Sequence, residues 1–421
     1  MGKRSRAATP ILYKLINLNL QRLFNIILVA FCGSWLLWKG LSGPLLILLL
    51  GIALVGNLKK ENQVQFQLIH AAWAVLFVLY ACSLYWSGTP DWSALERKLA
   101  FLAFPLLFAF KWKNPLPLAY MWLAHTLACF VLIAIAYYDA IMCQLTLGNS
   151  VRCFSTTYFS QLHHPSYFSA FLIFAIIGLL LGKVAWFRLQ PRWLSWLLIM
   201  LFAAMHLHLG ALAGIIALGS VLMIFAIYYS IQYFGTTKSI FLGSLILIVS
   251  IVLALFSKDI RLDAQNAAQF TSSYLENPTK FVEGRKEPLQ GNEVRLILWT
   301  ASVEIGTAHP FGLGLGGLEP ALSQKLIAWG YPEQAKKEFN PHNQFLQIWN
   351  EVGLLGLVIF IGILYVLLQQ FYTKRQLSGF LLTVVFIIFC LFESILQRES
   401  GIVFFLCWFT ALSMQPKITA P

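Results

Sequence analysis

Long apolar stretches recur along almost the whole chain, and they constrain its fold more than any other feature. We count twelve between residues 24 and 414, and short polar or charged breaks separate them. A helix crosses a bilayer with about 17 to 25 apolar residues, so the shorter stretches are expected to extend by a few residues or to meet a thinner bilayer. The predicted spans are 24–38, 41–57, 68–86, 97–110, 116–138, 166–182, 193–208, 212–233, 240–256, 351–370, 379–396 and 400–414.

The composition agrees with an all-α polytopic membrane protein of about 12 transmembrane helices. Of the 421 residues, 59% are apolar and only 11% are charged. An average soluble domain carries about a quarter charged residues, and its core cannot hide this much apolar surface. A soluble enzyme is therefore excluded.

The formal net charge of +13 can indicate nucleic acid, anionic lipid or membrane orientation. With twelve spans, 16 cations and the single acid Glu61 fall on the side of both termini, whereas the short loops of the other side hold five cations. Lysine and arginine favour the cytoplasmic side of a membrane. We therefore expect a multi-pass protein with both termini in the cytoplasm, in contact with membrane lipids and not with nucleic acid.

The spans divide the chain into three parts. Residues 1–256 hold the first nine helices and an outer loop at 139–165, residues 257–350 form one long outer loop, and residues 351–421 hold the last three helices. The long loop contains nine cations and ten acids, so it is nearly neutral. The outer face is the only plausible functional platform, because neither end carries a soluble domain.

The cysteines have no metal-ligand spacing. Cys143 and Cys153 lie in the outer loop, where an oxidising compartment would allow them to form a disulfide or leave them free. The other five fall within apolar spans and are interpreted as small core residues, namely Cys32, Cys82, Cys129, Cys390 and Cys407.

The long loop begins as mixed coil and short helix over 258–292 and then reads RLILWTASVEIGTAHPFGLGLGG. Arg295 and Trp299 recur at helical spacing, and the run from His309 to Gly317 is a turn-rich stop. No Gly-Lys-Ser/Thr follows the glycines, and no strand–helix unit surrounds them, so neither a P-loop nor a dinucleotide site is indicated. A tight connection explains these glycines better.

Two further helices are predicted before the chain returns to the membrane. LEPALSQKLIAWGYPEQAKKEF is amphipathic and suits a helix at the membrane surface. In NPHNQFLQIWNEVGLLGLVIF, His342 directly precedes a membrane helix that Asn340 or Asn343 can cap. A histidine at the lip of a span is either a structural hydrogen-bonding group or an acid–base group.

These motifs together resemble the O-antigen ligase and O-antigen polymerase superfamily of bacterial inner-membrane glycosyltransferases. The resemblance rests on RLILW, PFGLGLGG and PHNQFLQIWNEVGLLGLVIF over residues 293–365, and less strongly on VRCFSTTYFSQLHHPSYFS and FESILQRESGIVFFLCWF. It implies a GT-C-like fold in the inner membrane and a glycan donor linked to undecaprenyl pyrophosphate. It also implies an acceptor hydroxyl, as on lipid A-core, at the periplasmic face.

The reaction that the resemblance implies needs a base and cations, and these suggest roles for individual residues. His342 is the candidate base, and Arg295 and Arg152 are candidates for binding the pyrophosphate, because a guanidinium matches phosphate oxygens. Inversion follows if the hydroxyl attacks directly. We expect no metal, since the sequence offers no metal cluster, and a monomer.

One position departs from the family. An arginine is common in the short turn before the eighth span, where this chain has Leu212 in HLHLGALAGIIAL. Either Arg152 takes over its contact, or His206 or His208 helps, or activity is lost.

Several residues keep two interpretations. His163 and His164 either cap the helix at Pro165 or contact substrate, and Glu351 either orients His342 or serves the helix entrance. Glu393 either forms a structural ion pair with Arg398 or takes part in catalysis, and we favour the ion pair because acids near spans are rare unless paired. Trp299 either packs or stacks on sugar, and Asn343 is a further candidate for supporting the site.

Three other functions remain open. A polymerase that extends a glycan and a protein O-oligosaccharyltransferase would use the same donor with another acceptor. A polysaccharide transporter or flippase would show internal repeats and charged or broken helices at mid-bilayer, which the sequence does not show.

Overall fold

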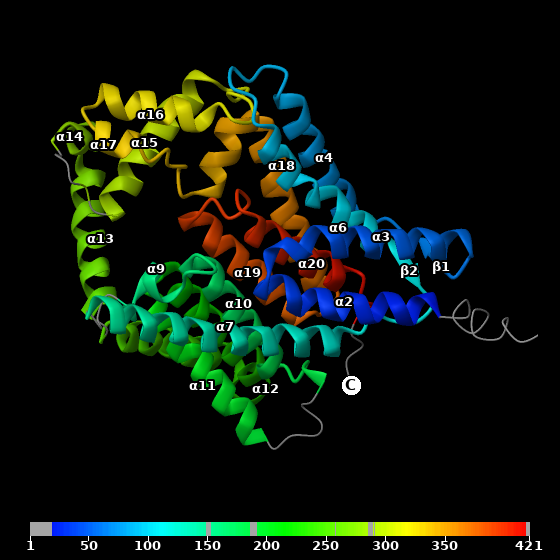
Figure 1. Ribbon diagram of the computed structural model, residues 1–421. Coiled ribbons are helices and arrows are strands. Elements are labelled where there is room, and N and C mark those ends of the chain that lie inside the picture. The colour runs from blue at the N-terminus through cyan, green and yellow to red at the C-terminus, as the bar shows by residue number, and fades with distance from the viewer. Residues whose placement is uncertain are drawn as a thin grey trace, which may run out of the picture.

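The computed structural model describes residues 19–148, 153–185, 192–256, 258–284, 289 and 291–417, and helices dominate it (Figure 1). The elements in chain order are α2 (Leu20–Leu37), η1 (Lys39–Leu41), α3 (Ser42–Leu58), β1 (Asn62–Val64), α4 (Leu68–Ser83), α5 (Trp92–Lys98), α6 (Ala100–Ala109), β2 (Phe110–Trp112), α7 (Leu118–Leu147), α9 (Thr156–Phe159), α10 (Pro165–Leu180), α11 (Arg192–Leu209), α12 (Leu212–Ala254), α13 (Lys258–Glu276), α14 (Pro278–Glu283), α15 (Gly291–Ala308), α16 (Leu318–Ala328), α17 (Pro332–Ala335), α18 (Gln344–Thr373), α19 (Leu377–Phe392) and α20 (Glu399–Ser413).

Helices lie in all twelve predicted ranges, which agrees with an all-α membrane protein. Within the described residues, five are long and apolar enough to cross a membrane by length and composition, namely Leu20–Leu37, Lys39–Leu58, Leu118–Thr146, Leu212–Leu253 and Gln344–Thr373. Other apolar helices are shorter, at 10–17 residues. The count of twelve crossings therefore stays a prediction.

Helix α12 contains two of the predicted spans. Gly235 has φ 72°, a left-handed conformation that ends the first half and lets the second half begin. A Cβ on Gly243 would lie 2.5 Å from Ile227 Cγ1, and one on Gly219 would lie 2.7 Å from Leu247 Cδ1. The two halves therefore turn back on each other and pack closely through glycine.

The main core lies around α10 and α20, whose side chains are almost all buried. Aromatic rings fill the space between these helices and α7: Trp122 stacks on Phe174 with centroids 3.9 Å apart, and Trp408 lies 4.5 Å from Phe174. These rings bury large apolar surfaces, which stabilises the packing of helices distant in sequence. The fold places the starts of α10 and α20 at the same end as the end of α19.

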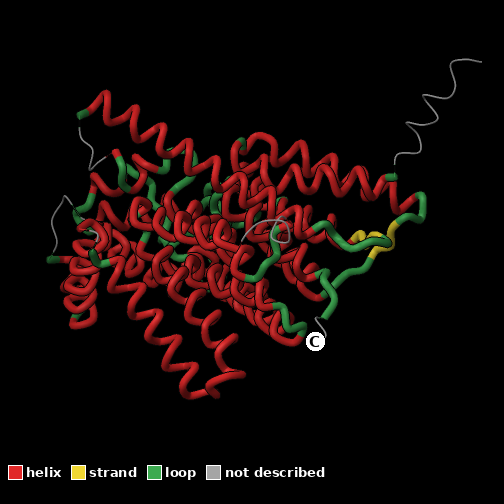
Figure 2. The backbone as a smooth tube through the Cα atoms, turned by 90° about the horizontal axis from the view of Figure 1, so that it is seen from below, coloured by secondary structure: helices red, strands yellow, loops and turns green. Residues whose placement is uncertain are grey.

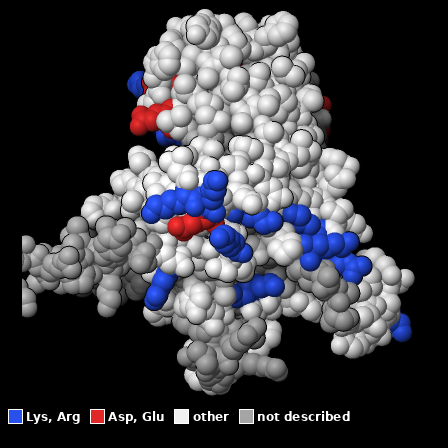
Figure 3. All heavy atoms as spheres, turned by 90° about the vertical axis from the view of Figure 1, so that its right-hand side faces the viewer, with Lys and Arg blue, Asp and Glu red and all other residues white. Residues whose placement is uncertain are grey.

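A small sheet departs from the predicted all-α architecture. Strands β1 and β2 pair antiparallel, with Gln63 opposite Lys111, beyond the ends of α3 and α6 (Figure 2). Lysine and arginine side chains gather on this end of the molecule (Figure 3). Lys111, Lys113 and Lys374 line one pocket here, and all three belong to the set predicted to be cytoplasmic.

The long loop is more helical than predicted. Residues 258–283 form the long helix α13 and the short helix α14 where mixed coil and short helix were expected. The predicted amphipathic helix that begins at Leu318 is broken at Gly330, φ 85°, into α16 and α17. Helices α13 to α17 share a second apolar core, separate from the main one, that includes Phe270, Ile297 and Leu322. This core holds α15 in place against α18, where Gly306 packs on the ring of Trp349.

The glycine-rich turn connects α15 to α16 and packs against α4 and α18, in agreement with the predicted tight connection. Gly312, Gly314 and Gly316 have φ of 78°, 81° and 95°. A Cβ on Gly312 would lie 2.6 Å from the backbone nitrogen of Gly353, and one on Gly314 would lie 2.5 Å from the carbonyl of Ser83. Gly353 itself, φ 77°, interrupts α18, so the turn docks where that helix is broken.

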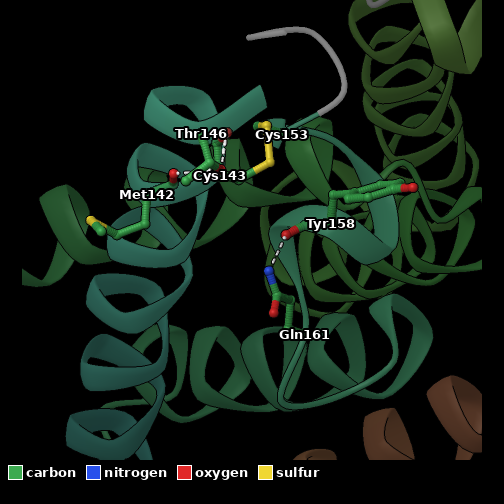
Figure 4. Close-up of a disulfide and its surroundings, with 6 residues drawn as sticks. All are labelled: Met142, Cys143, Thr146, Cys153, Tyr158 and Gln161. Carbon is green, nitrogen blue, oxygen red and sulfur yellow. Dashed lines mark hydrogen bonds between the residues drawn. A yellow bond between two sulfur atoms is a disulfide. The ribbon is translucent and has the colours of Figure 1, made fainter. Parts of the chain in front are cut away.

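A disulfide joins Cys143 to Cys153, which confirms that these two cysteines pair (Figure 4). It ties the last turn of α7 to the segment that leads through α9 to α10. Of the cysteines expected in the core, four are buried, but Cys82 is exposed on α4. The disulfide thus restrains the chain shortly before His164.

Candidate functional site

Glu393 is the centre of a group of polar side chains that come from distant elements. It directly follows α19, where the backbone becomes extended, and its side chain is 8% exposed. Arg295 Nη2 lies 3.4 Å from Glu393 Oε1, and His342 Nδ1 lies 3.1 Å from Glu393 Oε2. One carboxylate therefore brings together the arginine and the histidine that the sequence singled out.

Arg295 is presented by α15, the helix that the second core holds in place. Its side chain is 32% exposed, and only one of its guanidinium nitrogens is engaged at 3.4 Å with Glu393. An arginine carries five N–H donors in a planar fork. The guanidinium is thus anchored by one edge and keeps donors for a ligand.

His342 is held by its neighbours in a left-handed backbone conformation, φ 49°. The Asn340 side chain accepts a hydrogen bond from the His342 backbone N–H at 2.9 Å, and Trp299 Nε1 donates to the Pro341 carbonyl at 2.9 Å. Arg295 and Trp299 lie one turn apart on α15. That helix therefore supplies both a functional side chain and the support for the histidine.

Asn343 caps α18, which settles the choice between Asn340 and Asn343. Its Oδ1 accepts from the backbone N–H groups of Phe345 and Leu346, and its Nδ2 donates to the carbonyl of Leu391 at 3.2 Å. Leu391 lies two residues before Glu393. Asn343 therefore links the start of α18 to the end of α19, and this link keeps His342 close to Glu393.

The start of α10 also contributes side chains to the site. Ser166 Oγ donates to Glu393 Oε1 at 2.9 Å, and the charge of Glu393 acts on His164. Burial lowers the pKa of His164, and the positive charges of Arg398, His342 and Arg295 add to this while Glu393 opposes it, so the ring is neutral near pH 7. His163 serves packing instead, with its Nε2 2.7 Å from the carbonyl of Leu36. Neither histidine caps α10 through its side chain.

Glu393 is ionised at any physiological pH. Burial opposes its ionisation, but the hydrogen bond from His342 and the charges of His342, His164 and Arg295 outweigh burial and lower the pKa to about 2. A carboxylate that accepts from Nδ1 fixes the imidazole tautomer and leaves Nε2 as a proton acceptor. The geometry is that of an oriented general base.

A cavity of about 380 Å³ opens beside Arg295 and His342. Its lining residues come from the start of α15 and the residue Leu289 ahead of it, and from α17 and the segment that leads to α18. They are Leu289, Gly291, Asn292, Val294, Arg295, Gln334, Lys337, Phe339 and His342. His342 and Arg295 therefore face one space that a substrate can enter.

Glu351 does not contact His342 but belongs to a second, deeper cluster. Gln347 Nε2 and Gln397 Nε2 each donate to Glu351 Oε1 at 2.8 Å. Lys98 Nζ donates to Gln397 Oε1 at 3.1 Å, and Lys98 and Glu351 are each 1% exposed. Direct orientation of His342 by Glu351 is thus wrong, because the Nδ1 of His342 contacts Glu393 and the Oε1 of Glu351 accepts from Gln347 and Gln397.

Arg152, His206 and His208 were the candidates to replace the arginine that was expected at the position of Leu212. Arg152 is among the residues that the structure does not describe. His206 Nδ1 lies 3.0 Å from the carbonyl of Phe202, and His208 Nδ1 lies 3.0 Å from the carbonyl of Phe154. These bonds tie both histidines to neighbouring backbone. Within the described ranges, no group of three or more His, Cys, Asp or Glu side chains could hold a metal ion.

The sequence signalled Glu393 but gave it the wrong partner. An acid at the end of an apolar span needs a counter-charge, and Arg398 is the nearest in sequence. The structure pairs Glu393 with Arg295 and His342 instead, because the end of α19 faces the outer layer built by α15. Ser166 was missed altogether, since a serine one residue after a proline normally reads as part of a helix start.

The comparison with protein families agrees with this geometry. Residues 197–361 match the family described as O-Antigen ligase, a range that contains Arg295, Trp299, the glycine turn and His342. No curated protein matches the chain. The match confirms the resemblance to the O-antigen ligase and polymerase superfamily.

Proposed function

We propose that this member of the O-antigen ligase and polymerase superfamily is an O-antigen ligase. Its donor is a glycan linked to undecaprenyl pyrophosphate, and its acceptor is a hydroxyl of lipid A-core at the periplasmic face of the bacterial inner membrane. The family match supports the coarser statement, a membrane glycosyltransferase of the ligase or polymerase type. The undecaprenyl-pyrophosphate donor, the lipid A-core acceptor and the roles of individual residues are proposed beyond that statement.

The single observation that carries the proposal is the contact of Glu393 with both Arg295 and His342 beside a cavity. Transfer of a sugar from a pyrophosphate needs a base for the attacking hydroxyl and a cation near the departing phosphate. A carboxylate that orients the base and anchors the cation places both groups within reach of one substrate.

In the proposed step, the acceptor hydroxyl oxygen attacks the anomeric carbon while its proton passes to His342 Nε2. The bond from that carbon to the phosphate oxygen breaks, and its electron pair stays on the pyrophosphate. Glu393 stabilises the imidazolium that forms, as a buried carboxylate does for a catalytic histidine. Direct attack from the face opposite the leaving group inverts the anomeric configuration.

Arg295 binds the pyrophosphate in this scheme. Its free N–H donors reach phosphate oxygens through charge-assisted hydrogen bonds, which strengthen as negative charge grows on the leaving group. Such cations supply the charge stabilisation without a metal ion. Arg152 remains a second candidate, from the loop after α7.

The membrane architecture suits a lipid-linked donor. Apolar helices surround the main core, and the Glu393 cluster lies where α10, α19 and α20 meet the outer layer of α13 to α17. The polyprenyl chain can stay in the bilayer while its pyrophosphate reaches Arg295. The same geometry serves a polymerase or a protein O-oligosaccharyltransferase, which differ only in the acceptor.

Reconstitution tests the proposal. The full chain in proteoliposomes is given undecaprenyl-pyrophosphate-linked glycan with lipid A-core, with a glycan acceptor or with a protein acceptor. We expect transfer to lipid A-core with an inverted anomeric linkage, observed by mass spectrometry and NMR. Transfer only to one of the other acceptors would replace the ligase by a polymerase or a protein transferase. Transport of intact donor without transfer would contradict a transferase.

A further inference from the structure

The cavity beside His342 contains a cation that the proposed reaction has not yet used. Lys337 lines the same space as Arg295 and His342, although it lies five residues before the histidine. Its segment follows α17 and leads to the cap of α18. None of the described residues that line this cavity is acidic.

The charges of the site show why a further cation matters. Arg295 carries one positive charge, but Glu393 already accompanies it at 3.4 Å and is ionised near pH 7. His342 has to be neutral to accept a proton. The Glu393 cluster on its own is therefore close to electrically neutral, whereas a pyrophosphate diester carries about two negative charges.

Among the described residues, no carboxylate pairs with Lys337, so its charge remains available. Its side chain is exposed, and its Nζ donates to Gln334 Oε1 at 3.3 Å, which directs it along the cavity wall. It also lies 5.7 Å from the ring centroid of Phe339, and that ring lies 5.9 Å from His342. The ammonium, the phenyl ring and the imidazole thus follow one another along the same wall.

The neighbouring lysine offers a contrast. Lys336 Nζ lies 2.6 Å from Glu333 Oε1, so its charge is matched on the surface. Lys337 hydrogen-bonds a neutral amide instead, and the amide keeps the full positive charge available. A lysine on a flexible stem can follow a phosphate group as the substrate moves.

We propose that Lys337 binds a phosphate group of a substrate in the cavity beside Arg295 and His342. The inference rests on the proposed function and adds a second phosphate-binding residue to it. The phosphate belongs either to the donor pyrophosphate or to a phosphorylated acceptor, and the two sources are distinguished by which substrate binds more weakly when Lys337 is changed.

The test compares Lys337→Gln and Lys337→Arg with the matched control Lys336→Gln in the full chain in nanodiscs. Binding of undecaprenyl pyrophosphate is measured against undecaprenol, which lacks the phosphates, and against phosphorylated lipid A-core. Loss of a hydrogen bond to a charged group weakens binding on the order of tenfold. Where transfer is observed, KM is measured for each substrate together with kcat.

We expect Lys337→Gln to weaken undecaprenyl pyrophosphate binding and to raise the donor KM about tenfold, with undecaprenol unaffected. Lys337→Arg should restore most of the affinity, and Lys336→Gln should match wild type. Weaker binding of lipid A-core alone would assign Lys337 to the acceptor phosphate and support phosphate binding. Unchanged binding of both phosphorylated ligands by Lys337→Gln would overturn the inference. Binding that depends on Lys337 in a protein that transfers no glycan would instead overturn the proposed function.

Discussion

Two polar clusters lie at the two ends of the short segment 393–398, and they differ in access. At its start, the Glu393 cluster (Ser166, Arg295, His342 and Glu393) keeps 25% of the His342 side chain and 32% of the Arg295 side chain exposed. At its end, in the Glu351 cluster (Lys98, Gln347, Glu351 and Gln397), the first three side chains are almost completely buried and Gln397 is half-buried. A substrate can therefore reach only the Glu393 cluster. We interpret the Glu351 cluster as structural support for segment 393–398 and not as a reactive site.

Further bonds link the two clusters through this segment. Ser394 Oγ donates to Gln347 Oε1 at 3.3 Å, and the backbone N–H of Leu396 donates to Gln344 Oε1 at 2.6 Å. Hydrogen bonds between buried polar groups restrict how the elements that carry them can move relative to one another. We therefore expect the Glu351 cluster to fix the position of Glu393 relative to α18.

Breaking the Glu351 cluster should give the largest loss of stability. Lys98→Met leaves Glu351 as a buried charge without its cation, which costs about 3 kcal/mol or more. Glu351→Gln should be similarly harmful because it strands Lys98, whereas the double variant removes both charges and should recover much of the loss. Thermal unfolding in detergent measures all three. A double variant as unstable as the sum of the two single variants would contradict a charge pair bridged by Gln397.

Breaking the Glu393 cluster should affect catalysis more than stability. Glu393→Gln keeps the shape of the side chain but loses the charge that orients His342 and anchors Arg295, so transfer should fall on the order of 100-fold. The rate is measured in proteoliposomes, with Glu96→Gln, an exposed acid on α5, as the control. A transfer rate within twofold of wild type, at equal protein, would mean that the carboxylate has no role in the reaction.

The pH dependence of stability sharpens the contrast. The folded pKa of Glu393, about 2, lies below the unfolded value of about 4.3, so its contribution is present above the unfolded value and is lost as pH falls toward 2. The higher unfolding temperature of wild type relative to Glu393→Gln should therefore persist at pH 5 and be lost as pH falls below about 4.3. A difference already lost at pH 5 would contradict a carboxylate held ionised.

The smallest effect is expected at the helix cap between the clusters. Asn343→Ala removes the acceptor for two backbone N–H groups of α18 and should destabilise the protein by about 1 kcal/mol. Asn343→Asp keeps an acceptor and should retain most of the stability, although it loses the amide donor to Leu391. Chemical denaturation measures both variants. An alanine variant equal to wild type would show that the cap contributes nothing measurable.

Local patterns predicted the parts of the fold that depend on neighbouring residues. The apolar stretches placed helices in all twelve ranges, and the glycines of 312–316 indicated the tight turn that docks against Gly353. The predicted spans 212–233 and 240–256 also flank the break that the structure places at Gly235. The long helix α13 was harder to predict, because its amphipathic face packs against α15, which lies in another part of the chain.

The site was predicted as residues but not as contacts. Motif resemblance singled out Arg295 and His342, and the cost of placing an acid near a span drew attention to Glu393 and Glu351. Their partners come from other elements, with Ser166 on α10 and Lys98 on α5, and sequence spacing carries no information on such contacts. Lys337 was hidden for another reason, since nothing in its local pattern separates it from Lys336.

The central claim is that His342, oriented by Glu393, is the base for glycan transfer. Transfer of glycan from undecaprenyl pyrophosphate by purified His342→Ala tests it most directly, with protein level and unfolding temperature measured in parallel. We predict that transfer falls below detection while the variant accumulates and unfolds near the wild-type temperature. Transfer at the wild-type rate by His342→Ala would contradict the claim.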